Sequence, residues 1–298
     1  MKSLIIGYGV QGQKRAKFIK KKDLVIFDPF YKFSDYKRFS DINFKDIKYG
    51  YVCTPEKNKF ILVEKLVKKK INILVEKPFI LKPSQAKKLK KLLKKNKNSL
   101  YVAYNHRFEP NIIKIKNLLN KKIIGRIYNT ELYYGNGTAK LWKNKWRERK
   151  KDSIIDDLGV HLLDIFLFIF GFLPSKVKYT LRKKNELRCY DYCQFNSTDK
   201  FNTNFTVSLI DWKNYFRINI IGSKGSLHMD NLCKWGTSKL FIRRRKFPSG
   251  YPKEKIQSIK SKDPTWEKEE NYFKNLCKKK LNNLFENSKI NFGRNNIK

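Results

Sequence analysis

The sequence of 298 residues contains little histidine or cysteine and no long apolar run. Three His and five Cys, without a C-x-x-C pair, argue against a structural zinc site, so we predict no metal centre. The cysteines are scattered and odd in number, which excludes a disulfide framework and is typical of free thiols in a reducing compartment. The longest apolar run, Ile165–Leu173, is far shorter than the roughly twenty residues of a membrane span.

Proline and glycine are also scarce. Nine Pro and 14 Gly are too few for a collagen-like or low-complexity chain. The N-terminus passes directly into an apolar strand without a signal peptide, so we expect a cytoplasmic protein. Hydrophobic residues make up 41% of the sequence and aromatics 14%, which excludes disorder as the main state. A chain of this length accommodates two ordinary domains.

Acidic residues are few: 26 Asp and Glu stand against 68 Lys and Arg, for a formal net charge of +42. Such a charge attracts nucleic acid, anionic lipid or phosphorylated small molecules. The stretch Arg243–Lys246, with aromatic residues nearby, is typical of single-strand binders, but also of a basic edge strand and loop. A genome composition that enriches Lys, Asn, Ile and Phe together explains the excess without such a partner. We favour that explanation and expect neither nucleic acid nor a membrane as partner.

A glycine-rich motif lies at the start of the chain. The apolar run Leu4–Ile6 is followed by G-Y-G-V-Q-G at residues 7–12 and then by a helical pattern. Gly7 permits a tight turn, Gly9 lets the backbone approach a pyrophosphate, and Gly12 lets the helix pack closely on the strand. The pattern predicts a dinucleotide site, and an ordinary strand-to-helix turn is the alternative.

Strands and helices alternate over the first hundred residues. We expect strands at 24–27, 49–53, 71–75 and 100–103, and helices near 58–69 and from Pro83 onward. This alternation predicts a parallel, doubly wound sheet. Asp28 ends the second strand, where a carboxylate can bind the ribose hydroxyls of NAD and repel the 2′-phosphate of NADP. The alternatives are a turn residue before Pro29, or NADP admitted by Arg38 and nearby lysines.

The rest of the chain shows strand patterns instead of further alternation. We expect an antiparallel sheet with a wide face from 127–134 and from five strands between 176 and 229. Helices are expected at Ile154–Phe170, which holds two candidate catalytic residues, and at Pro264–Lys280. Residues 291–298 are expected to form a truncated or frayed tail.

Further motifs occur in a fixed order after the glycine turn. They are Thr54-Pro55, Glu76-Lys77-Pro78, Asn105-His106-Arg107-Phe108, Asp157-Leu158-Gly159-Val160-His161 and Ile221-Gly222-Ser223-Lys224-Gly225-Ser226-Leu227. This order resembles the Gfo/Idh/MocA family of NAD(P)-dependent oxidoreductases over about residues 1–230. The resemblance implies a Rossmann domain at 1–120, followed at 121–298 by an α+β domain for substrate binding and oligomerisation. It also implies NAD as cofactor, with NADP as the alternative, and a homo-oligomer.

The resemblance and the positions of the residues together give a candidate site. The candidate cofactor-binding residues are Gly7, Tyr8, Gly9, Val10, Gln11, Gly12, Asp28, Thr54, Pro55, Glu76 and Lys77. The candidate substrate-binding residues are Asn105, His106, Arg107, Trp146 and Arg147. For Arg107, a structural salt bridge is the alternative to an anion or hydroxyl contact.

Three residues are candidates for catalysis. Lys77 follows a parallel strand, where ligands bind in open α/β sheets, and its ammonium can hold and polarise a substrate hydroxyl. Asp157 and His161 are four residues apart and share a face if the segment is helical. An imidazole changes protonation near neutral pH, so His161 is the candidate general base, with Asp157 orienting it or the substrate. The alternatives are a surface lysine and a plain helix-surface Asp–His pair.

Two departures from the family pattern bear on function. The stretch Lys150–Ser153 lacks the glycines that many relatives have there, and Asn58 or Lys59 stands where relatives often carry a histidine. We predict a dehydrogenase or reductase that transfers a hydride between the nicotinamide and a CH–OH or ketone carbon of a sugar, cyclitol or sugar-nucleotide. The positive charge suits an anionic substrate. The alternatives are a non-catalytic dinucleotide-binding sensor or partner subunit, and a basic protein that binds nucleic acid or an anionic surface.

Overall fold

The computed structural model describes residues 1–297 and divides the chain into two compact units. The first unit consists of Met1–Tyr104 and Trp266–Ser288, and the second of Asn105–Thr265 and the residues from Lys289 onward. The sequence predicts a single domain boundary after residue 120, whereas each unit of the structure is made of two chain segments. Helix α4 (Pro110–Asn120) belongs to the second unit because its buried apolar side chains face that unit's core, and the chain returns to the first unit near its end.

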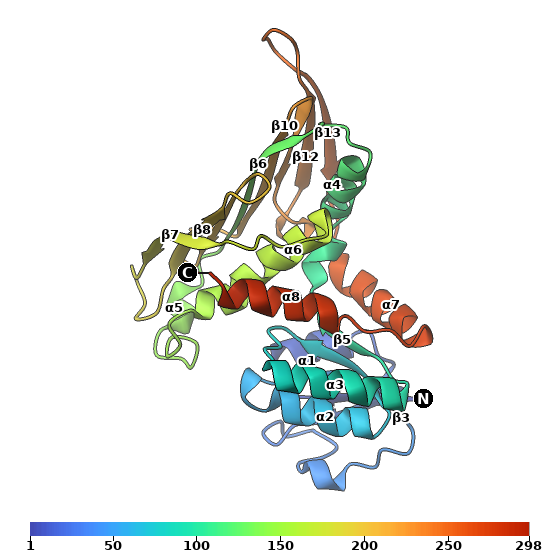
Figure 1. Ribbon diagram of the computed structural model, residues 1–298. Coiled ribbons are helices and arrows are strands. Elements are labelled where there is room, and N and C mark those ends of the chain that lie inside the picture. Colours follow the sequence, from blue (N-terminus) through green and yellow to red (C-terminus); the bar gives the residue numbers. More distant parts are fainter. Residues whose placement is uncertain (298) are drawn as a thin grey trace. The chain divides into compact units, whose positions relative to one another are not determined.

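The first unit is built on a five-stranded parallel sheet (Figure 1). Its strands are β1 (Lys2–Ile6), β2 (Leu24–Phe27), β3 (Ile47–Val52), β4 (Asn72–Glu76) and β5 (Leu100–Ala103), in the order β2-β1-β3-β4-β5. The chain goes from β1 to β2 on one side and then to β3 on the other, which creates the switch point where open α/β sheets bind ligands. The predicted doubly wound sheet is confirmed.

Helices cover both faces of this sheet. They are α1 (Val10–Ala16), α2 (Lys59–Lys68), α3 (Pro83–Asn96), α7 (Thr265–Lys278) and the beginning of α8 (Leu284–Asn295). Alternate residues of β3 point to opposite faces: Gly50 adjoins Leu66 of α2, whereas Tyr49 and Tyr51 contact Phe273 of α7. Helix α7 confirms the helix predicted from 264 to 280.

The predicted tail is helical over most of its described length. Helix α8 continues to Asn295, so the expectation of a frayed segment from residue 291 is wrong for residues 291–295. The reason is that Ile290 and Asn291 are buried and anchor this helix. Lys298 lies outside the described residues.

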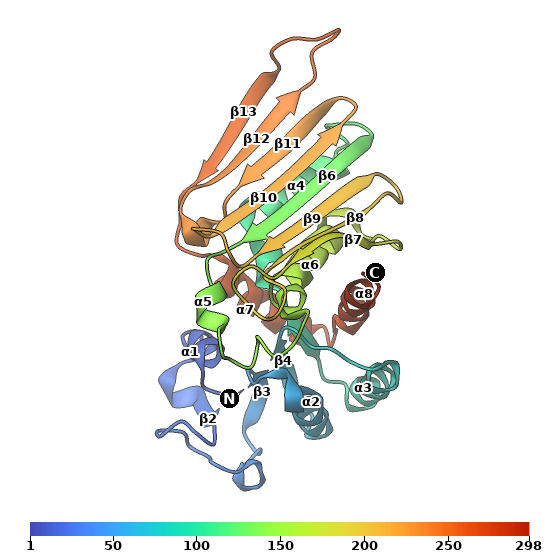
Figure 2. The same cartoon turned by 90° about the vertical axis from the view of Figure 1, so that its left-hand side faces the viewer.

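The second unit contains an eight-stranded sheet, seen face-on in Figure 2 with α4 and α6 (Val160–Phe170) behind it. The strand order is β13-β12-β11-β10-β6-β9-β8-β7, and every neighbouring pair is antiparallel except β6–β9. The strands are β6 (Ile127–Gly135), β7 (Lys178–Lys183), β8 (Tyr192–Ser197), β9 (Asn202–Ser208), β10 (Tyr215–Gly222), β11 (Gly225–Asp230), β12 (Ser238–Arg244) and β13 (Lys253–Ile259). The large, mostly antiparallel sheet is as predicted, and β12 and β13 extend it.

The segment with the Asp-x-Gly-x-His motif has two helical forms. Residues Ile155–Gly159 form a π-helical turn, and α6 continues from Val160 to Phe170. A π-turn inside a helix is rare and is frequently found at functional sites. Within residues 1–297, no helix is both long and apolar enough to cross a membrane.

Candidate active site

The glycine turn is shaped by three different backbone constraints. Gly7 has φ +88°, a conformation that side chains rarely adopt. A Cβ on Gly12 would lie 2.1 Å from the carbonyl oxygen of Gly7, so the closeness of α1 to the turn requires glycine there. A Cβ on Gly9 would meet nothing within 4 Å, and its backbone is exposed. The backbone at Gly9 is therefore open to a ligand.

Asp28, at the tip of β2, lies directly beside this turn. Its Oδ2 accepts a hydrogen bond from the Tyr8 backbone N–H at 2.7 Å, and its Oδ1 accepts from Phe30 N at 2.8 Å and Tyr31 N at 3.2 Å. The side chain is only half-buried. Because a carboxylate has about four acceptor positions, Asp28 can still accept a hydrogen bond from a ligand hydroxyl.

Thr54 and Pro55 follow β3, and Thr54 adjoins the glycine turn. A Cβ on Gly7 would lie 3.1 Å from Thr54 Cγ2. Thr54 Oγ1 is a buried polar atom that has no hydrogen-bond partner among the described residues. The structure thus brings Gly7, Asp28 and Thr54 together at one end of the parallel sheet. The exposed side chains of Val10 and Gln11 begin α1 at the same place.

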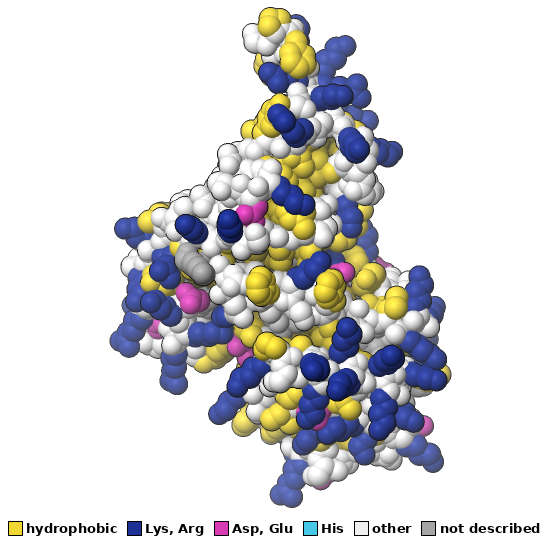
Figure 3. All heavy atoms as spheres, in the orientation of Figure 1, with side chains coloured by type: hydrophobic (Ala, Val, Ile, Leu, Met, Phe, Trp, Pro, Cys, Tyr) yellow, Lys and Arg dark blue, Asp and Glu magenta, His cyan; other side chains and the backbone are white. Residues whose placement is uncertain are grey.

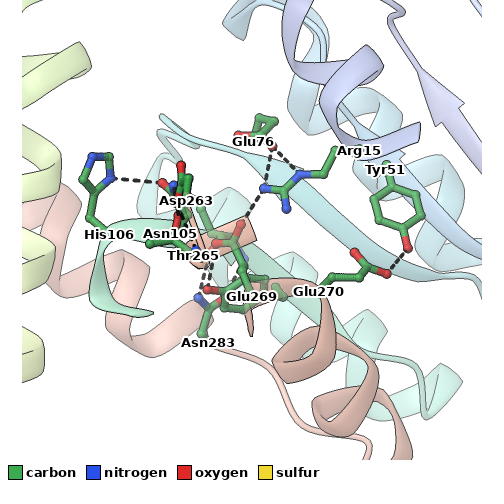
Figure 4. A network of polar contacts seen from close by, with 12 residues as sticks. Arg15, Tyr51, Glu76, Asn105, His106, Asp263, Thr265, Glu269, Glu270 and Asn283 are labelled. Atoms are coloured by element: carbon green, nitrogen blue, oxygen red, sulfur yellow. Dashed lines mark hydrogen bonds and ion pairs between the residues drawn. The ribbon is translucent and has the colours of Figure 1, made fainter. Parts of the chain in front are cut away.

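The Glu-Lys-Pro triplet ends β4, and the Lys77–Pro78 peptide bond is cis. The Glu76 side chain is held by Arg15 of α1, whose guanidinium lies 2.7 Å from its Oε1. The same guanidinium binds Glu269 of α7 at 2.6 Å, as Figure 4 shows. This buried network anchors the residue just before Lys77.

In the second unit, two histidines and a tyrosine form one cluster. The rings of His106 and His161 lie 4.0 Å apart, and the ring of Tyr134, at the end of β6, lies 5.5 Å and 6.0 Å from them. All three side chains are buried. Burial, together with the charges of Asp157 and Asp263, raises the pKa of Tyr134 well above its usual range. Asp157 therefore lies near the same cluster as His161.

Sequence reasoning missed one cation of this cluster. Lys234 follows β11, and its Nζ lies 3.0 Å from His106 Nε2 and 4.3 Å from the centre of the Trp235 ring. Because the ammonium donates to Nε2, His106 carries its proton on Nδ1 and donates to Asn105 Oδ1 at 3.0 Å. Asn105 in turn donates to Thr265 Oγ1 at 2.9 Å, as Figure 4 shows. One lysine among 55 carries no signal in the sequence that would single it out.

The other candidate substrate residues have structural neighbours of their own. Arg107 is buried in an ion pair with Asp164 of α6, which matches the structural alternative for this residue. The Arg147 guanidinium lies 4.8 Å from the ring of Trp146, which is half exposed. Within residues 1–297, no group of three His, Cys, Asp or Glu side chains is arranged to hold a metal ion.

Comparison with known families accounts for both units. A model of an oxidoreductase family with an NAD-binding Rossmann fold matches residues 11–104, and a model of the GFO/IDH/MocA C-terminal domain matches residues 112–228. The chain belongs to the Gfo/Idh/MocA oxidoreductase family. Its first unit is the NAD-binding Rossmann domain of that family, which confirms the resemblance read from the motifs.

Individual relatives are distant. The uncharacterized oxidoreductase YdgJ of Escherichia coli K12 is 29% identical over 132 residues, which is 44% of this chain and 38% of that protein. The chain spans about half or less of the length of the three curated relatives it matches.

Solved structures resemble the chain over nearly all of its length. Levoglucosan dehydrogenase in complex with NADH has a TM-score of 0.81 at 14% identity and covers 100% of this chain and 95% of that one. The UDP-N-acetylglucosamine 3-dehydrogenase of Acidithiobacillus ferrooxidans has a TM-score of 0.78 at 17% identity, with 100% and 96% covered. At these identities the likeness establishes the fold.

Proposed function

We propose that this protein is an NAD-dependent dehydrogenase or reductase acting on a CH–OH or ketone carbon of a sugar, cyclitol or sugar-nucleotide. Membership of an oxidoreductase family supports the reaction type. Two structural relatives are a levoglucosan dehydrogenase and a sugar-nucleotide dehydrogenase, which supports the substrate class. A homo-oligomer and a reducing, cytoplasmic location remain part of the proposal.

The glycine turn fits NAD. The open backbone at Gly9 leaves room for a pyrophosphate, and the N–H groups of the first turn of α1 face it. Asp28 accepts hydrogen bonds from the ribose hydroxyls, and its negative charge disfavours NADP. Thr54, after the end of β3, borders the same turn, and Pro55 follows it in the chain. Tyr8, Val10 and Gln11 supply the remaining contacts of this loop.

When bound, NAD supplies the carbon that accepts or gives a hydride. Lys77 donates a hydrogen bond to the substrate oxygen and stabilises negative charge on it. His161 takes the hydroxyl proton during oxidation and returns it during reduction, so the proton and the hydride are both accounted for. Asp157 orients the imidazole or the substrate. Asn105 and His106 contribute polar groups beside His161.

The observation that carries this proposal is the cluster of His161, His106 and Tyr134 in a chain whose other unit is an NAD-binding domain. The test is a spectrophotometric assay at 340 nm with NAD⁺ and NADP⁺ over sugars, cyclitols and sugar-nucleotides, run on wild type and Lys77→Met. We expect turnover with NAD⁺ and at least a 100-fold loss in the variant, with NAD still bound.

Lys82→Met is the control, because Lys82 lies outside the Glu-Lys-Pro triplet and caps α3. Its kcat is expected to match wild type. NAD binding by the wild type without turnover over the whole panel would favour a non-catalytic sensor or partner subunit.

A further inference from the structure

Lys59 is a lysine with 3% exposure, in a chain whose lysines mostly face solvent. It begins α2, and its Nζ donates to the carbonyl oxygen of Glu76 at 2.6 Å and to that of Pro78 at 3.0 Å. These two carbonyls belong to the residues on either side of Lys77. The ammonium therefore bridges the backbone that carries the lysine of the Glu-Lys-Pro triplet.

Other groups hold the same segment at its two ends. Arg15 binds the Glu76 carboxylate, and the Asn287 amide of α8 donates to the Phe79 carbonyl oxygen at 2.9 Å. Both contacts lie outside the bridge that Lys59 forms. Lys59 thus joins the backbone before Lys77 to the backbone after it.

The burial of an amine here has a cost that the fold alone does not require. Burial lowers the pKa of Lys59 to about 8, further lowered by the charge of Lys77, while Glu76 and Glu56 raise it. An unpaired buried ammonium is expensive, and an apolar side chain would avoid that desolvation. The hydrogen bonds to the two carbonyl oxygens offset part of that desolvation.

We propose that Lys59 is a positioning residue for Lys77, which it serves by fixing the peptide segment from Glu76 to Pro78. This inference rests on the proposed function of Lys77 in hydride transfer. Lys59 itself contacts neither substrate nor cofactor in this role. A misplacement of about 1 Å at a reacting group can reduce a rate roughly 100-fold, so loosening this segment is expected to be visible in kcat.

The test compares Lys59→Met with Lys57→Met, an exposed lysine two residues earlier. We expect Lys59→Met to lower kcat about 10- to 100-fold while the Kd for NAD stays within threefold. Amide hydrogen exchange in the peptide that covers residues 76–80 should accelerate, and the strands β1 and β3 should keep wild-type protection. Lys57→Met should match wild type in all three measurements.

Three outcomes would overturn the inference. Wild-type kcat in Lys59→Met removes the role, and so does unchanged exchange at 76–80. Faster exchange throughout the first unit, with kcat per NAD-binding site unchanged, assigns Lys59 to stability alone. If Lys59→Met does not fold, Lys59→Gln, which keeps an amide NH2 group as donor, must show smaller changes in the same direction, and wild-type behaviour in it contradicts the proposal.

The design separates this inference from the proposed function. Exchange at residues 76–80 and the rate at which acetic anhydride acetylates Lys77 do not require a substrate. If the wild type turns over nothing while both measurements change in Lys59→Met, the positioning stands and the proposed reaction fails. If turnover is present and neither measurement changes, the proposed reaction stands and the positioning fails.

Discussion

Two buried polar groups of this molecule use charge in different ways. In the first unit, Arg15 binds Glu76 and Glu269, and these side chains are almost excluded from solvent. In the second unit, His106 and His161 lie against the ring of Tyr134, and the Lys234 ammonium lies beside His106. The first group is a guanidinium held between two carboxylates, and the second contains two imidazoles, which are side chains that can act as general acids or bases.

The difference shows what each group is suited for. Burial alone lowers the pKa of Arg15, but the carboxylates of Glu76 and Glu269 outweigh it and raise that pKa above the ordinary value. A guanidinium held in this way does not transfer protons and instead links α1, β4 and α7. An imidazole in contact with other rings can take and return a proton. The group around Arg15 is therefore suited to holding α1, β4 and α7 together, and the histidine cluster is suited to proton transfer.

The scarce acidic residues follow the same division. Many of those in the interior bind a cation or backbone N–H groups, and the buried acidic residues are Glu76, Glu109, Glu148, Asp156, Asp164, Asp191, Glu269 and Glu270. Lysine, by contrast, is mostly exposed, and Lys and Arg side chains are spread over the face that Figure 3 shows. The acidic residues that this basic sequence retains are therefore often those with partners in the interior.

The largest effect is expected from removing the imidazole of His161. His161→Ala should lower kcat about 10²- to 10⁴-fold, because general base catalysis typically contributes that factor. NAD binding, measured by NADH fluorescence, should stay within threefold. His228→Ala is the matched control, since His228 bonds Asn219 and Ser226 in the sheet. If His161→Ala keeps wild-type turnover, His161 is not the base, and the second cluster is structural like the first.

Much of the first unit could be predicted from the sequence because its signals are local. Short apolar runs, most of them followed by a helical pattern, predict the parallel sheet directly. The glycine turn is equally local, and its three constraints are visible at Gly7, Gly9 and Gly12. The return of α7 and α8 to this unit was not predicted, because pairs such as Arg15 and Glu269 are 254 residues apart.

The site was predictable only where motifs mark it. His161, Asp157 and Lys77 belong to sequence motifs. Tyr134 is brought to the histidines by the register of β6 in the sheet, and Lys234 by the loop after β11. The π-turn at Ile155–Gly159 was likewise expected as ordinary helix, since its hydrogen-bond pattern has no signal in side-chain periodicity. Such residues are found by the fold that brings them together, not by spacing along the chain.

The ion pairs of Arg15 with Glu76 and Glu269 can be broken by removing the guanidinium. Arg15→Met leaves Glu76 and Glu269 as buried carboxylates without their guanidinium, so the free energy of unfolding of the first unit should fall by about 3–5 kcal/mol. Urea unfolding followed by hydrogen exchange in peptides of β1 and β4 measures this. Arg243→Met is the control, because Arg243 pairs with Glu254 at a partly exposed site and should cost less than about 1 kcal/mol. A loss as small as the control's would show that the network does not stabilise α7.

The smallest of these effects is a pH dependence that sharpens the comparison. Burial, opposed by Arg15 and reinforced by Glu76, raises the pKa of Glu269 from its ordinary 4.5 to about 7. The folded state therefore binds more protons than the unfolded state between these values, so the stability from Glu269 is complete below pH 4.5 and is lost as pH rises through 7. The loss should reach at most about 3 kcal/mol. Glu269→Gln should remove this part of the pH dependence, whereas Glu267→Gln, exposed on the same helix, should leave it unchanged. Equal slopes in wild type and Glu269→Gln would mean that Glu269 stays ionised beside Arg15 throughout this pH range.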